Sequence, residues 1–167
     1  MRHKGNYLFI TGMVRSGTTL LDKILDSHEQ VSLFSQPFPF IFRLAKSKFF
    51  KQINYPETYY TLNNLFNERY YKPELFLEYL RKDKIEKGEI DTVFSDMKNW
   101  SGQYTSVKNS IKLTDGLKST NFINTYKYLL SGFNSNKNAK VLGSKEVLTE
   151  EFIPIFLEND IKVIIII

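Results

Sequence analysis

The sequence contains no cysteine. Disulfide bonds and thiolate metal sites are therefore excluded, and the absence favours a reducing compartment. No apolar stretch approaches the length of a membrane span, and the N-terminus lacks the apolar segment and small-residue cleavage site of a secretory signal. From these absences we expect a soluble, cytoplasmic protein with no membrane partner.

The composition is that of a globular chain rather than a disordered one. Of the 167 residues, 42% are hydrophobic and 15% aromatic, which is enough for one domain with a sizeable core. The net charge of +5 suits an anionic ligand. The basic run at 81–87 also contains Asp83 and Glu86, which indicates a solvated helix face, so we expect no nucleic-acid partner.

Predicted strands and helices alternate along the chain. Short apolar segments predict strands at 6–12, 30–40, 140–146 and 163–167. Amphipathic or capped segments predict helices at 17–28, 72–84, 119–132 and 149–159. This order predicts an α/β fold, with a parallel sheet of the P-loop NTPase type flanked by helices. We expect one domain over 1–167, with a helical insertion at about 43–131.

Three of the predicted helices carry local signals. In the helix at 17–28, one stripe holds Leu20, Leu21, Ile24, Leu25 and His28, as in an amphipathic helix. The helix at 72–84 begins at a proline and has Leu75, Tyr79 and Leu80 on one face. For the helix at 119–132, a Ser or Thr is the expected cap and Gly132 the expected stop.

The sequence ends on five β-branched apolar residues, Val163 to Ile167. Such a run is typical of a strand covered on both faces inside a parallel sheet. A bare apolar strand invites edge pairing and aggregation. We therefore expect an incomplete domain, truncated at this strand, with functional residues beyond it.

One loop carries the strongest chemical signal. The segment ITGMVRSGTTLLDKIL (10–25) contains two glycines, Gly12 and Gly17, in the frame G-x-x-x-x-G-x-[ST] of a phosphate-binding loop. It lies between a predicted strand and a predicted helix, so its backbone N–H groups and the helix dipole can hold an anion. Arg15 adds a forked, delocalised cation.

The lysine of nucleotide-hydrolysing loops is missing. Thr18 stands where that lysine would grip the terminal phosphates, and no convincing strand-terminal Asp is present to help hold Mg²⁺. The loop is therefore predicted to bind a terminal group other than a magnesium-bound triphosphate, and no metal site is expected.

These residues resemble a known family. Residues 7–31 are similar to the N-terminal motif of sulfotransferases that use 3′-phosphoadenosine 5′-phosphosulfate (PAPS), nearest to tyrosylprotein sulfotransferases and their bacterial relatives. The motif is R-S-G-T-T-L, here Arg15 to Leu20, followed by Asp26, Ser27 and His28. LGSKE (142–146), with the helix and strand after it, is also similar, whereas the middle of the chain is compatible only in character.

The resemblance implies a site and a reaction. The donor would be bound by Arg15, Ser16, Gly17, Thr18, Thr19 and Leu20. Arg15 and Lys145 would be catalytic, neutralising charge on the bridging oxygen as the sulfuryl group moves to a hydroxyl or amine. The acceptor could be a small molecule, a carbohydrate or a peptide, with the insertion at about 43–131 on the acceptor side.

The chain departs from the family pattern at the base. Gln36 occupies the position of the catalytic Glu of tyrosylprotein sulfotransferases, and an amide cannot accept a proton at neutral pH. His28, Glu146 and Asp115 are alternative bases, although His28 also suits a polar cap on its helix. The residues that bind the 3′-phosphate are expected beyond Ile167.

Two other readings stay open. A nucleotide kinase or ATPase with a degenerate loop would need magnesium-dependent ATP binding. A non-catalytic binding module, for example one that binds nucleic acid through the basic helices of 42–87, would show a steep salt dependence.

Overall fold

The computed structural model describes residues 5–37, 39–54, 72–99 and 119–167. Its centre is a parallel sheet of β1 (Asn6–Gly12), β2 (Val31–Ser35), β3 (Val141–Lys145) and β4 (Ile161–Ile166). The strand order is β2-β3-β1-β4. The predicted α/β class and parallel sheet are confirmed. The predicted boundary of one domain, with its insertion, stays a prediction.

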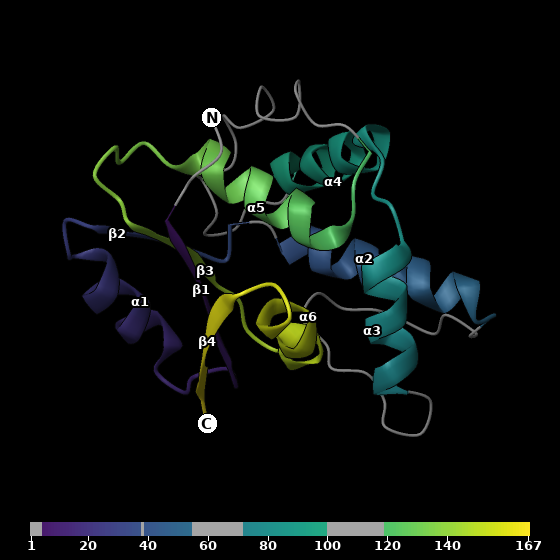
Figure 1. The fold of residues 1–167 in the computed structure, drawn as a ribbon, viewed down its shortest axis with the longest axis horizontal. Coiled ribbons are helices and arrows are strands. Elements are labelled where there is room, and N and C mark those ends of the chain that lie inside the picture. The colour runs from purple at the N-terminus through teal and green to yellow at the C-terminus, as the bar shows by residue number, and fades with distance from the viewer. Residues whose placement is uncertain (1–4, 38, 55–71, 100–118) are drawn as a thin grey trace.

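The two crossover connections of the sheet run in opposite directions along the strand order. From β1 it passes through α1 (Thr18–Asp26) to β2, and from β3 through η3 (Glu150–Phe152) and α6 (Ile153–Leu157) to β4. Parallel crossovers are right-handed, so connections that run in opposite directions place their helices on opposite faces. Figure 1 shows α1 on one side of the sheet and α6 on the other.

The face opposite α1 carries the main core. Four further helices lie there with α6: α2 (Pro39–Gln52), α3 (Pro73–Lys82), α4 (Lys87–Asn99) and α5 (Phe122–Phe133). Phe9 of β1 is fully buried and its ring centroid lies 4.2 Å from that of Phe156. Phe42 meets Phe152 edge-on at 4.8 Å. Such aromatic contacts contribute about 0.5–1.5 kcal/mol each beyond area burial, so they fix these helices on the sheet.

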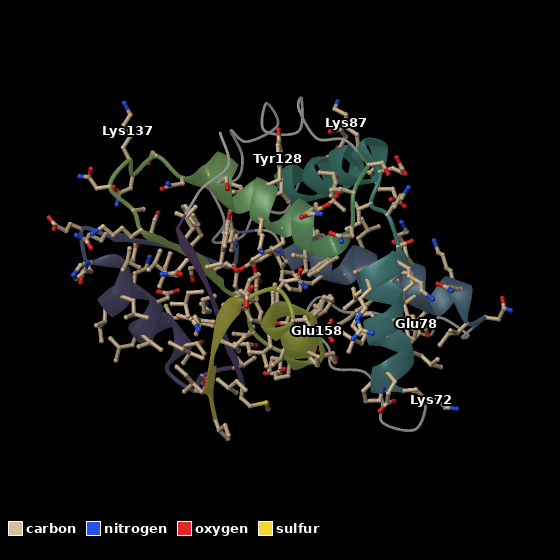
Figure 2. The ribbon with its side chains drawn as sticks, viewed as in Figure 1. Lys72, Glu78, Lys87, Tyr128, Lys137 and Glu158 are labelled. Carbon is tan, nitrogen blue, oxygen red and sulfur yellow. The ribbon has the colours of Figure 1, made fainter. Side chains whose placement is uncertain are left out.

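Ion pairs join helices that are distant in sequence. The ammonium of Lys46 on α2 lies 3.0 Å from the carboxylate of Glu151 on η3, and both side chains are almost fully buried. At the surface, the guanidinium of Arg81 on α3 binds both carboxylate oxygens of Glu158 after α6. Figure 2 shows Glu158 in the region where α6 faces α3.

The structure corrects two of the helix predictions. The cap of α5 is Asn121, whose side-chain oxygen accepts the Asn124 N–H at 2.9 Å, and the helix runs one residue past Gly132. A glycine does not stop a helix whose flanking residues, here Leu130 and Phe133, pack against the core. On α3, Tyr79 and Leu80 are buried as predicted, but Leu75 is 47% exposed.

The predicted apolar stripe of α1 does not face the sheet as a whole. Leu20 and Ile24 are 68% and 58% exposed, whereas Thr18 and Asp22 are buried. The helix is rotated about its axis so that a polar pair, Thr18 and Asp22, is turned inward. Tertiary placement has here overridden the hydrophobic pattern.

Candidate active site

A crevice is expected where the two crossover directions diverge. The chain leaves β1 towards β2 and leaves β3 towards β4, so the loops after these neighbouring strands separate at their carboxyl ends. The Leu148 N–H donates to the Gly12 carbonyl at 3.3 Å, and the Gln36 N–H donates to the Lys145 carbonyl at 2.7 Å. The carboxyl ends of β1, β2 and β3 are thereby held together.

The loop after β1 depends on unusual backbone angles. Gly12 has φ 154°, and a Cβ there would lie 2.1 Å from the carbonyl oxygen of Ile166 on β4. Gly17 has φ 92° and caps the N-terminus of α1, with no atom within 4 Å of a would-be Cβ. Arg15 is held at φ 68° without being a glycine. Strain of this kind concentrates at ligand sites, where the surrounding structure enforces it.

Several hydrogen-bond donors of this loop have no partner among the residues that the structure describes. The Leu21 N–H bonds to the Gly17 carbonyl at 3.1 Å, so the N–H groups of Thr18, Thr19 and Leu20 come before the first bond of the helix. The Ser16 hydroxyl is buried and has no hydrogen-bond partner among the described residues. Together with the positive end of the helix dipole, these groups suit an oxyanion.

Lys145 lies at the end of β3 beside this loop. It is 3% exposed, so it is not an ordinary surface lysine. Burial lowers the pKa of Lys145, the carboxylates of Asp22 and Glu146 oppose that shift, and the Lys23 ammonium adds to it. A largely desolvated cation therefore lies one strand away from the loop after β1.

Asp22 is a buried acidic residue near this loop that the sequence reasoning did not single out. It lies on the buried side of α1 at 2% exposure, and neither carboxylate oxygen has a hydrogen-bond partner in the described part of the chain. The signal in the sequence that could have identified Asp22 is its spacing from Thr18. Thr18 and Asp22 are four residues apart and so share a helix face, which is an unusual pair to place against a sheet.

A comparison with protein families identifies the chain. A family model described as "Sulfotransferase family" matches residues 8–137, well over half of the sequence. The chain belongs to the sulfotransferase family. The match includes residues 43–131, whose sequence resembles the family only in its general character, and it ends before Lys145. No curated protein matches the chain.

The alternative bases of this sulfotransferase occupy different places. His28 follows the C-terminal end of α1, where its Nδ1 accepts the Gln30 N–H at 3.1 Å. A helix of nine residues is about 13 Å long, so His28 is well separated from the loop. Glu146 is fully buried, and Asp115 lies outside the described residues. Gln36 lies directly beside Lys145.

A second polar cluster lies at the end of β1. The hydroxyls of Thr11 and Thr149 are 3.1 Å apart, and the Thr11 hydroxyl donates to a Glu150 carboxylate oxygen at 3.4 Å. Thr11 and Thr149 are fully buried. These bonds fasten the loop after β3 of the sulfotransferase to the end of β1.

The described part of the sulfotransferase offers no group of three His, Asp or Glu side chains suited to a metal ion. Among those same residues, every helix is too short or too polar to cross a membrane.

Proposed function

We propose that the protein transfers a sulfuryl group from PAPS to a hydroxyl or amine. Membership of the sulfotransferase family supports the reaction class. The observation that carries the choice of donor is the loop after β1. It presents a buried Ser16 hydroxyl without a hydrogen-bond partner in the described part of the chain, and the N-terminal amides of a helix, but no lysine for a triphosphate.

The 5′-phosphosulfate of the donor would bind along this loop. The backbone N–H groups of Thr18, Thr19 and Leu20 supply donors, whereas the Ser16 N–H donates to the Met13 carbonyl at 3.2 Å, and Gly17 leaves open space beside them. Thr18 and Thr19 add hydroxyl groups, one buried and one exposed. Arg15 is exposed and brings a forked cation to the same loop.

The cations of the site would act on the leaving group. In the transfer, the bond from sulfur to the bridging phosphate oxygen breaks while a bond from sulfur to the acceptor forms, so negative charge develops on the bridging oxygen. Arg15 and Lys145 would stabilise that charge. A preorganised donor in such a place contributes about 3 kcal/mol. The low exposure of Lys145 strengthens its effect, because little water screens it.

The acceptor must release a proton during this reaction. The Gln36 amide cannot take it, so an acceptor with an acidic hydroxyl needs the least help from the protein. We propose a small molecule, carbohydrate or peptide acceptor rather than nucleic acid, and a cytoplasmic location, which the absence of cysteine supports. The helices between β2 and β3 are the proposed acceptor side.

Calorimetry of the full-length protein with 3′-phosphoadenosine 5′-phosphate (PAP), the product of the donor, tests this function. We expect PAP to bind without a metal ion, and Arg15→Ala to weaken binding by roughly tenfold or more, since a charge-assisted contact is lost. Arg43→Ala, which removes another exposed arginine on α2, is the matched control and should bind as the wild type does. Binding of ATP only with Mg²⁺, and none of PAP, would refute the proposal in favour of a kinase-like protein.

A further inference from the structure

We propose that Asp22 is a positioning residue whose buried carboxylate keeps the Lys145 ammonium charged beside the donor loop. The inference deepens the proposed function, on which the catalytic role of Lys145 rests. No motif of the sequence points to Asp22, and only the packing of α1 on the sheet brings it to the site.

The two groups approach from different elements. Asp22 lies one helical turn after Thr18, on the side of α1 that packs against β1, β2 and β3. Lys145 is the last residue of β3. Asp22 is 2% exposed and Lys145 is 3% exposed, so both are enclosed between the helix and the strand ends.

The Asp22 carboxylate has a physical need for a nearby cation. Both of its oxygens are buried without a hydrogen-bond partner among the described residues. An isolated buried carboxylate is costly unless an opposite charge compensates it. The attraction of the Asp22 carboxylate raises the pKa of Lys145, although no direct hydrogen bond joins the two side chains.

Burial and three charged groups decide the protonation of Lys145. Asp22 and Lys23 act on it from α1, and Glu146 follows it on the chain. Burial lowers the pKa of Lys145, and the Asp22 carboxylate is the leading influence that raises it. Loss of the Asp22 charge therefore lowers the pKa of Lys145 further. The neutral amine, which cannot stabilise an anion, then appears at lower pH.

An NMR titration of the ligand-free protein tests the coupling directly. The side-chain resonance of Lys145, assigned by its loss in Lys145→Arg, is followed against pH in the wild type, Asp22→Asn and Glu29→Gln. Glu29 is an exposed carboxylate just after α1 and serves as the control. We expect a lower pKa of Lys145 in Asp22→Asn only. An unchanged pKa of Lys145 in Asp22→Asn would overturn the inference.

The pH dependence of PAP binding gives a second readout. In Asp22→Asn, the ratio of affinity at about pH 9 to that at neutral pH should fall by roughly threefold or more relative to the wild type. Asp22→Glu, which keeps the charge, should restore the wild-type ratio. In a Lys145→Arg background, Asp22→Asn should leave the ratio unchanged, because arginine stays protonated.

The two readouts separate two failures. If the wild type binds no PAP, the proposed donor is wrong, and the NMR titration still decides the role of Asp22. If Asp22→Asn does not fold, Asp22→Ser, which also removes the charge, replaces it in both the NMR titration and the binding measurements. A wild-type pH profile in a folded Asp22→Asn would mean that Asp22 only fills space, which contradicts the proposal.

Discussion

Alanine at the two loop glycines should affect different properties: mainly stability at Gly12, and mainly PAP binding at Gly17. At Gly12, a Cβ would lie 2.1 Å from the Ile166 carbonyl oxygen, and this obstacle is backbone of the paired strand β4. A backbone atom cannot rotate away as a side chain does. The clash costs about 1–3 kcal/mol or more. The backbone angle of Gly12, φ 154°, adds further strain. We expect Gly12→Ala to lower the free energy of unfolding by about 3 kcal/mol or more.

Gly17 lacks that obstacle. Its would-be Cβ meets nothing within 4 Å, so Gly17→Ala carries only the left-handed strain of φ 92°, about 1–2 kcal/mol. The variant can relieve this strain by turning the peptide that presents the Thr18 N–H. That movement disturbs the anion site, so PAP affinity should fall roughly tenfold or more.

Urea denaturation and calorimetry with PAP measure the two effects on the same samples. The expected pattern is a large loss of stability for Gly12→Ala, and for Gly17→Ala a smaller loss of stability together with a roughly tenfold or greater loss of PAP affinity. If Gly12→Ala is no less stable than Gly17→Ala, the close approach of β1 and β4 at Gly12 is wrong. If Gly17→Ala binds PAP as the wild type does, the loop is not the donor site.

Two further predictions concern buried polar contacts. Lys46→Met should lower the free energy of unfolding by about 3–5 kcal/mol, because the enclosed Glu151 carboxylate loses its main cation. The double variant Lys46→Met with Glu151→Leu should be less destabilised than Lys46→Met alone, because no buried charge is left unpaired. Urea denaturation measures both variants. An additive double variant would contradict this. Tyr126→Phe removes the buried hydroxyl 2.9 Å from Ser144 and should cost about 1–3 kcal/mol in the same assay, with no change in PAP affinity. A selective loss of affinity would instead place Tyr126 at the donor site.

The sequence determined the elements and the loop. A short apolar segment, two glycines and an amphipathic stretch predicted β1, the phosphate-type loop and α1, because strand and helix periodicity and glycine spacing are local properties. The same local pattern, with threonine in place of lysine, pointed to the sulfotransferase family. The loop residues from Arg15 to Leu20 could therefore be named without coordinates, and their roles remain predictions.

The tertiary structure decided which residues share the site. The rotation of α1 exposes Leu20 and Ile24 and buries Asp22, although hydrophobicity alone predicts an apolar stripe. The strand order brings Lys145 beside a loop more than 120 residues earlier in the chain, and it buries a lysine that by sequence is as readily a surface residue. Burial and long-range packing depend on the summed energy of many distant contacts. No single segment contains that information, whereas the strand, the loop and the helix are each encoded within a few neighbouring residues.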